Sequence, residues 1–127
     1  MGKNLLKIRE NVNKNNNPEG KFDDSKNIRF AHTSEKEFSR ILDFYKIRWE
    51  YEPRTFALEF DIKGNPEASF TPDFYLPDLD LYIELTTLNQ NLVTKKNYKI
   101  KKLKELYPDI NIKLFYKKII IVYYSSI

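Results

Sequence analysis

The sequence predicts an α/β fold in which one helix is followed by three or four antiparallel strands, a second helix and a final strand. Apolar residues recur at helical spacing over residues 34–45 and 93–107, as they do along the buried stripe of an amphipathic helix. Between these segments, residues 80–86 alternate with the two-residue period of a β-strand. With 127 residues and 41% hydrophobic content, the chain has enough apolar material for the core of one compact domain.

The N-terminal segment, residues 1–27, differs from the rest in composition. It contains the run from Asn13 to Gly20, which has no apolar periodicity and cannot offset the entropy lost on ordering. We therefore expect a disordered or flexible arm over residues 1–27 and a folded domain over residues 28–127.

The first predicted helix covers residues 34–45 and carries its apolar residues on one stripe. Ser34 fits the N-cap and Glu37 the N3 position of a capping box, in which each side chain bonds the backbone amide of the other residue. This assignment gives Glu37 a structural role and leaves Glu35 free.

The remaining elements are predicted from strand periodicity and from the Pro and Gly residues that interrupt regular structure. A second helix is expected over residues 93–107, where Pro108 stops it. Strands are expected over residues 48–52, 55–60, 70–76, 80–86 and 111–116. A turn over residues 77–80 would fold two of these strands against each other.

Two carboxylates are expected to meet on these two neighbouring strands. The aliphatic residues of 80–86 take one face, so Glu84 takes the other, and the same alternation over 70–76 places Asp73 beside it. Such a pair suits a hard divalent cation such as Mg²⁺, which keeps several waters and needs one or two protein carboxylates. Carboxylates on the solvent face of an antiparallel hairpin are also common for solubility alone.

Charge is unevenly distributed along the chain. Residues 28–90 contain seven Lys or Arg and twelve Asp or Glu, whereas residues 91–118 contain nine and two. Six lysines without an intervening acid lie on the second predicted helix: Lys95, Lys96, Lys99, Lys101, Lys102 and Lys104. A solvated helix face is one interpretation. Because like charges repel unless a polyanion neutralises them, a phosphate-contacting surface is the better one.

Composition disfavours several classes of protein. The chain has no cysteine, which excludes disulfides, zinc-thiolate sites and a cysteine nucleophile. Neither a signal peptide nor a membrane-spanning stretch is visible, so a cytoplasmic location without membrane contact is the default expectation. The only histidine, His32, favours a structural or surface role, and no Gly-rich phosphate loop or Ser-His-Asp set is present.

A Pro-Asp pair on one strand and a Glu on the next resemble the PD-(D/E)XK nuclease superfamily, the restriction-endonuclease-like fold. The resemblance is greatest to phage-type endonuclease I, the Holliday junction resolvase that acts on four-way DNA junctions. The matching residues, from Glu35 to Tyr116, cover about two thirds of the chain and include 47–52, 70–77, 82–84 and 106–112. The resemblance implies a restriction-endonuclease-like core, with an α-β-β-β-α-β order and a central mixed β-sheet of about four to five strands flanked by helices.

The resemblance also implies the residues of a catalytic site. Members of the superfamily carry a helix Glu, the Asp, the strand Glu and a Lys two residues later, around one or two Mg²⁺ or Mn²⁺ ions. Glu35, Asp73 and Glu84 fill the first three positions, with Asp73 and Glu84 as metal ligands, but Thr86 stands where the pattern has Lys. A hydroxyl cannot supply the positive charge that stabilises the reacting phosphate.

Either a lysine of the following helix fills this catalytic role or the site is weakened. Lys95 and Lys96 are nearest in sequence, and Lys96 shares the helix face of Ile100 and Leu103, which should turn toward the sheet. We therefore favour Lys96 as the catalytic lysine. The other lysines of the helix, Lys95, Lys99, Lys101, Lys102 and Lys104, are expected to contact the nucleic acid backbone.

The implied partner is DNA, and cutting both strands of a junction implies a homodimer or a partner subunit. The alternative is a nuclease-like module that has lost catalysis and binds nucleic acid or docks a protein. Thr86 favours this alternative. Retention of Asp73 and Glu84 argues against it, since a binding-only domain gains little from carboxylates that face phosphates.

Overall fold

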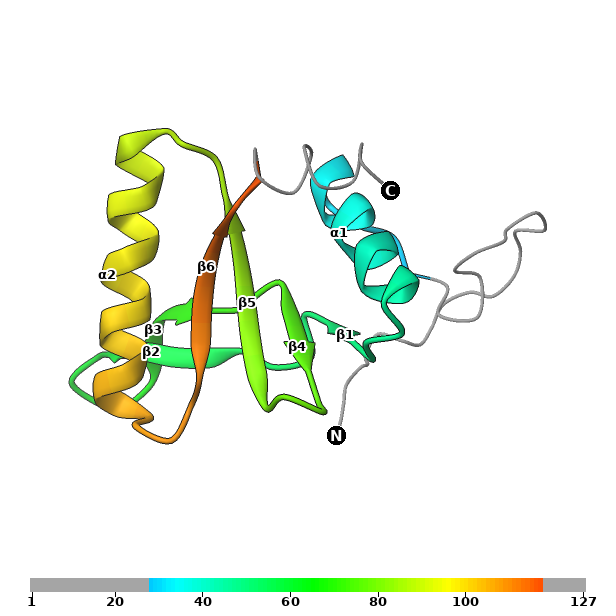
Figure 1. The fold of residues 1–127 in the computed structure, drawn as a ribbon. Coiled ribbons are helices and arrows are strands. Elements are labelled where there is room, and N and C mark those ends of the chain that lie inside the picture. Colours follow the sequence, from blue (N-terminus) through cyan, green and yellow to red (C-terminus); the bar gives the residue numbers. More distant parts are fainter. Residues whose placement is uncertain (1–27, 118–127) are drawn as a thin grey trace.

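The protein has an α/β fold that consists of a four-stranded mixed sheet, a separate two-stranded sheet and two helices (Figure 1). A computed structural model describes residues 28–117, so the predicted arm over residues 1–27 lies outside the described residues. In chain order, the elements are α1 (Thr33–Phe44), β1 (Glu50–Tyr51), β2 (Phe56–Phe60), β3 (Pro66–Phe70), β4 (Phe74–Leu76), β5 (Leu81–Thr86), α2 (Gln90–Leu106) and β6 (Ile112–Tyr116). Neither helix of this region is long and apolar enough to cross a membrane.

The main sheet has the strand order β1-β4-β5-β6. β4 pairs antiparallel with β1 and with β5, whereas β6 runs parallel to β5. The predicted turn over residues 77–80 joins β4 to β5, and in it Leu79 N donates to Leu76 O at 3.1 Å. Parallel neighbours need a crossover connection, which α2 provides between β5 and β6. The expectation of a mixed sheet is confirmed, with four strands.

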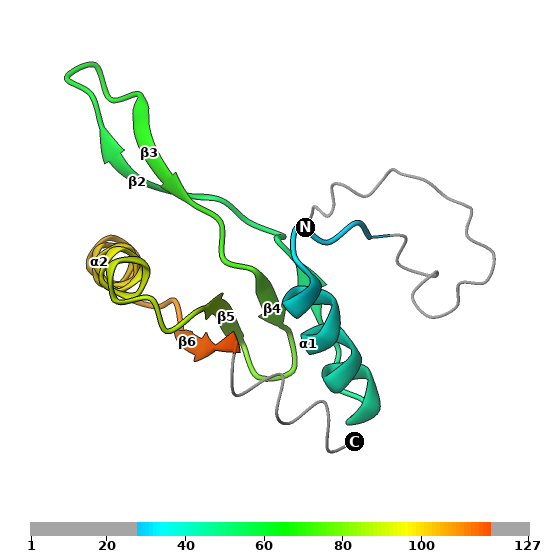
Figure 2. The ribbon, with the colours of Figure 1, turned by 90° about the horizontal axis from the view of Figure 1, so that it is seen from above.

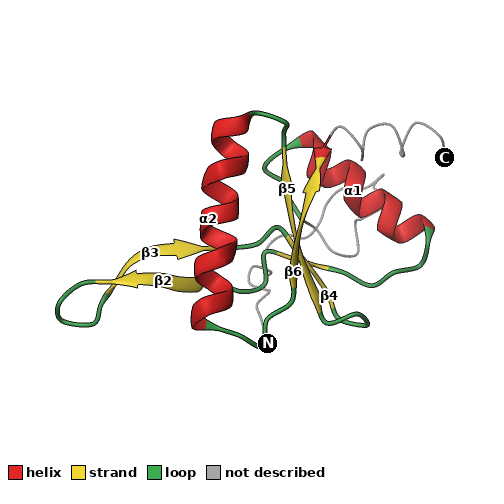
Figure 3. Ribbon diagram, turned by 60° about the vertical axis from the view of Figure 1, so that its left-hand side comes forward, coloured by secondary structure: helices red, strands yellow, loops and turns green. Residues whose placement is uncertain are grey.

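The expectation of one strand over residues 70–76 is wrong, because the chain divides there between two sheets. β3 ends at Phe70 and pairs with β2, while β4 begins at Phe74. Pro72 lies in the break and has no N–H to donate to a neighbouring strand. β2 and β3 therefore form a hairpin that projects from the main sheet on the side of α2 (Figure 2, Figure 3).

Two hydrophobic clusters cover the two faces of the main sheet, which lies between the helices. One joins α1 to the sheet and consists of Phe38, Ile41, Leu42, Trp49, Phe74, Leu76, Ile83 and Leu85. The other joins α2 and the hairpin to the opposite face and consists of Phe56, Leu58, Phe70, Tyr82, Leu103 and Ile112. β5 alternates between these clusters as predicted. Because Glu84 is 6% exposed, its face is not a solvent face, and the solubility interpretation of this carboxylate is wrong.

The second helix begins earlier than its periodicity predicts. α2 starts at Gln90 rather than at residue 93, because the Asn89 side chain accepts a hydrogen bond from Leu92 N at 3.1 Å and caps the helix. The helix ends at Leu106, close to the predicted stop ahead of Pro108.

Candidate functional site

Asp73 and Glu84 meet where β4 begins beside β5. Asp73 directly precedes β4, and the pairing of Phe74 with Ile83 brings Glu84 next to it. Leu85 N donates to Asp73 Oδ2 at 2.8 Å, and Asp73 N donates to Glu84 Oε1 at 3.2 Å. The two acidic residues are 8% and 6% exposed. Each carboxylate thus accepts a hydrogen bond from a backbone amide of the segment that carries the other one. The two carboxylates converge, as the sequence predicts.

This environment favours the protonated form of both acids. Burial, followed by repulsion from Glu84, raises the pKa of Asp73 from 3.8 to about 8. Burial also raises the pKa of Glu84, against the opposing effect of Lys96. Two buried carboxylates side by side are costly to ionise unless positive charge is added. The site therefore attracts a cation.

Lys96 places an ammonium group at these carboxylates. It lies on the face of α2 that also carries Ile100 and Leu103, and it is half-buried. Its Nζ is 3.2 Å from Glu84 Oε2 and donates to Leu85 O at 2.5 Å. The structure thus brings the expected lysine from the helix to the strand, and its catalytic role stays a prediction.

Glu35 lies at the start of α1 and is 4% exposed. Its Oε1 accepts hydrogen bonds from Ala31 N at 3.1 Å, from the Tyr51 hydroxyl at 2.5 Å and from His32 N at 3.4 Å. His32 is exposed and forms the N-cap of α1, in agreement with the structural role expected for it.

The predicted capping box of Ser34 and Glu37 is wrong, since the N-cap is His32, two residues earlier than predicted, and Glu35 occupies N3. The Ser34 hydroxyl is buried and has no hydrogen-bond partner among the described residues. Glu35 also faces the carboxylate site, because its charge contributes to the raised pKa values of Asp73 and Glu84. It therefore caps the helix and acts electrostatically on the site.

If the site hydrolyses DNA, as the resemblance implies, Glu35→Gln should lower the cleavage rate while changing the melting temperature little, because the amide oxygen can still accept the capping bonds. Glu37→Gln, on the half-buried neighbour that makes no capping bond, should affect neither quantity strongly. Single-turnover rates and melting curves of both variants test the ranking. Wild-type cleavage by Glu35→Gln combined with slow cleavage by Glu37→Gln would assign the site to Glu37 instead. Glu35→Ala should in addition lose about 1 kcal/mol of stability.

Thr86 lies two residues after Glu84 on β5 and is fully buried. Its Oγ1 has no hydrogen-bond partner among the described residues. The Cβ atoms of Glu84 and Thr86 share one face of the strand, so the hydroxyl stands on the side that Lys96 approaches from α2.

The other lysines expected to bind nucleic acid lie on α2. Lys102 is half-buried, whereas Lys95, Lys99, Lys101 and Lys104 are exposed. Lys99 Nζ is 5.8 Å from the centre of the Phe70 ring, so this lysine points toward the hairpin. The helix thus presents exposed positive charge beside the carboxylate site.

Two residues of the site region have no sequence signal that singles them out. Tyr51 lies on a predicted strand, and only the fold shows that its hydroxyl bonds Glu35. Arg54 lies between β1 and β2, outside any periodic segment, and only the fold shows that its guanidinium lies over the Phe56 ring.

The oxygen atoms that fit a hard cation are those of Asp73, Glu84 and the Leu85 carbonyl. Glu84 Oε2 and Leu85 O already face the Lys96 ammonium, so a positive charge is accommodated there. Within residues 28–117, no group of three or more His, Cys, Asp or Glu side chains is arranged to hold a metal. Mg²⁺ nevertheless fits this set, because it usually keeps several waters and uses one or two carboxylates.

Comparisons with protein-family models, with curated proteins and with solved structures found no match to this chain. Family and activity must therefore be inferred from the residues themselves.

Proposed function

We propose that the protein is a divalent-metal-dependent endonuclease that hydrolyses phosphodiester bonds of DNA, with Mg²⁺ or Mn²⁺ as cofactor. The observation that carries the proposal is the convergence of Asp73, Glu84 and Lys96 from two strands and a helix. The resemblance to the PD-(D/E)XK superfamily supports it, and the endonuclease I type makes junction DNA the first substrate to test. A restriction-endonuclease-like core is part of the same proposal.

Each residue has a distinct part in the proposed reaction. Asp73, Glu84 and the Leu85 carbonyl would hold the cation. A divalent ion held there would lower the pKa of a bound water and would offset the charge that develops on the phosphate. Lys96 supplies the positive charge at the phosphate that Thr86 cannot supply. Glu35 adds further negative charge near Asp73 and Glu84, since it contributes to the raised pKa values of both.

The alternative, a nuclease-like binding module without catalysis, is favoured by one observation. Thr86 stands where the superfamily has its strand lysine, and its buried hydroxyl makes no compensating hydrogen bond to any residue of the range 28–117. The alternative predicts metal-independent DNA binding and no turnover.

Incubation with supercoiled plasmid and with a four-way junction, in Mg²⁺, Mn²⁺ or chelator, separates the two functions. We expect nicking or cutting with either metal and none in chelator. Asp109→Asn, which removes one exposed carboxylate, serves as a charge-matched control for Asp73→Asn. DNA binding by the wild type without cleavage in either metal would reject the nuclease and leave the binding module.

Junction cleavage makes a further prediction about assembly. The described residues of one chain form one candidate site. The paired cuts of a four-way junction therefore need two copies of the chain or a partner subunit. We expect light scattering to give the mass of a dimer when the protein is bound to junction DNA. A monomer that cuts linear single strands as fast as junctions would indicate a nicking or repair-type nuclease.

A further inference from the structure

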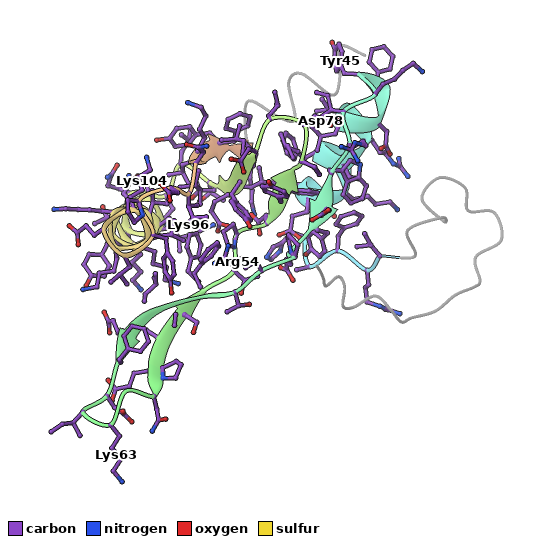
Figure 4. The ribbon with its side chains drawn as sticks, turned by 90° about the horizontal axis from the view of Figure 1, so that it is seen from below. Tyr45, Arg54, Lys63, Asp78, Lys96 and Lys104 are labelled. Carbon is purple, nitrogen blue, oxygen red and sulfur yellow. The ribbon has the colours of Figure 1, made fainter. Side chains whose placement is uncertain are left out.

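Arg54 carries an exposed guanidinium near the carboxylate site. Its Cζ lies 4.3 Å from the centre of the Phe56 ring and 6.0 Å from that of the Tyr107 ring. The backbone around Arg54 lies beside Asp73, since Glu52 N donates to Asp73 O at 2.9 Å and the hydroxyls of Thr55 and Thr71 are 2.7 Å apart. Figure 4 labels Arg54 in the middle part of the molecule. A guanidinium stacked on a ring uses its flat face, so N–H donors at its edge stay available to a ligand.

The guanidinium also lies near the strand that carries Glu84. Burial raises the pKa of Tyr82, and the charge of Arg54 opposes this increase, which places the guanidinium near the Tyr82 hydroxyl. Tyr82 and Glu84 are two residues apart on β5, so their side chains share a face about 7 Å apart along the strand. Arg54 thus lies over the Phe56 ring and near Tyr82, which is two residues from Glu84 on β5.

No carboxylate within residues 28–117 forms an ion pair with Arg54. The charges of Glu50 and Asp80 raise the pKa of Tyr82. Asp80 also accepts a hydrogen bond from the Tyr75 hydroxyl at 2.8 Å. The contrast with Arg48 is informative, because Arg48 forms an ion pair with Asp78 at 2.5 Å. Arg54 is a positioned, exposed cation whose charge remains unneutralised.

We propose that Arg54 binds a backbone phosphate of the DNA strand, next to the phosphate that lies at Asp73 and Glu84. This inference rests on the proposed function. The planar fork of a guanidinium matches two oxygens of a phosphate, and such bonds are stronger than those between neutral groups. Arg54 sets the position of the DNA strand along β5 and does not contact the phosphodiester bond that breaks. It is a binding residue, whereas Lys96 acts on the reacting phosphate.

The test measures DNA affinity separately from cleavage. Fluorescence anisotropy with a labelled duplex and Ca²⁺ gives the dissociation constant over a range of salt concentrations. Arg54→Gln should weaken binding roughly tenfold, the loss expected for a charge-assisted contact, and should reduce the salt slope by about one. Arg54→Lys should keep the slope but lose part of the affinity, because it retains the charge without the fork. Cleavage at saturating DNA and Mg²⁺ should stay near the wild-type rate for both variants.

Lys46→Gln is the matched control, since it removes one exposed cation next to Tyr45, which lies at the far end of the molecule from Arg54 in Figure 4. Equal losses in Lys46→Gln and Arg54→Gln would overturn the proposal, as would wild-type affinity and slope in Arg54→Gln. A lower rate at saturating DNA with unchanged affinity would also overturn it. Wild-type protein that binds DNA but does not cleave it would reject the nuclease while the Arg54 result still stands. Absence of any DNA binding would reject both.

Discussion

Asp73→Asn and Glu84→Gln are each expected to abolish DNA cleavage while leaving DNA binding intact or making it tighter. Each substitution removes an oxygen ligand of the cation and, with it, a negative charge that repels phosphate when no cation is bound. The backbone amides that orient these side chains can still bond the amide oxygen of Asn or Gln. A loss of rate without a loss of folding is therefore the expected result.

The same variants should reveal the buried charge through the pH dependence of stability. Burial and then repulsion from Glu84 raise the pKa of Asp73 to about 8. Between about pH 4 and pH 8, the folded protein holds a proton on Asp73 that the unfolded chain has released, so stability falls as the pH rises. Asp73→Asn removes the part of this dependence that comes from Asp73 and leaves the part that comes from Glu84. In chelator at pH 8, the variant should melt several degrees above the wild type, since 1 kcal/mol is worth about 4–8 °C in a domain of this size.

Mg²⁺ should raise the melting temperature of the wild type at pH 8 and leave that of Asp73→Asn nearly unchanged, because a ligand that binds only the folded state stabilises it. Asp109→Asn should behave as the wild type in all of these measurements. Cleavage by Asp73→Asn or Glu84→Gln at the wild-type rate with Mg²⁺ would remove both residues from the site. A melting temperature of Asp73→Asn below that of the wild type at pH 8 would show that the Asp73 carboxylate stabilises the fold.

The convergence of Asp73 and Glu84 could be predicted from sequence because the turn over residues 77–80 sets their register. Strand alternation then fixes the face of Glu84, and Asp73 follows although the predicted strand 70–76 is divided. Strand periodicity predicts a strand over residues 55–60 but none over residues 66–70, where the structure has β3. Local periodicity also cannot show that β2 and β3 form a sheet of their own, because sheet membership depends on contacts between segments that the local pattern does not encode.

The details that the sequence misses depend on such distant partners. The sequence favours Glu37 at N3 of a capping box because Ser34 is a common N-cap residue, whereas the structure places Glu35 at N3, where the Tyr51 hydroxyl bonds it from another element. The Arg54 guanidinium lies 6.0 Å from the centre of the Tyr107 ring, which is distant from it in sequence. No local pattern encodes either contact.

Lys96→Met is expected to lower the single-turnover cleavage rate by two or more orders of magnitude with a modest change in DNA affinity. Among the described residues, Lys96 is the cation that forms an ion pair with the site, 3.2 Å from Glu84 Oε2. Met preserves the length of the buried stem, so packing against α2 is largely kept. Loss of the ammonium also raises the proton affinity of both carboxylates, so the rates must be compared at saturating Mg²⁺.

Two other lysines of α2 provide the controls. Lys95 is exposed and lies about 100° from Lys96 around the helix. The Lys95→Met variant should therefore cleave at nearly the wild-type rate. Lys102→Ala should weaken DNA binding and flatten its salt dependence without changing the rate at saturating DNA.

A swap of the lysine between helix and strand separates a relocated catalytic residue from a lost one. Thr86 is fully buried, so Thr86→Lys fits best when the Lys96 ammonium has been removed from the same side of β5. If the catalytic lysine has moved from the strand to α2, the double variant Thr86→Lys, Lys96→Met should recover part of the rate that Lys96→Met loses. If Lys96→Met and Lys95→Met both cleave normally while Thr86→Lys alone raises the rate sharply, no lysine of α2 serves the site. The charge at the phosphate would then have been lost with the strand lysine, and the weakened, binding-only function would explain the buried carboxylates better than catalysis does.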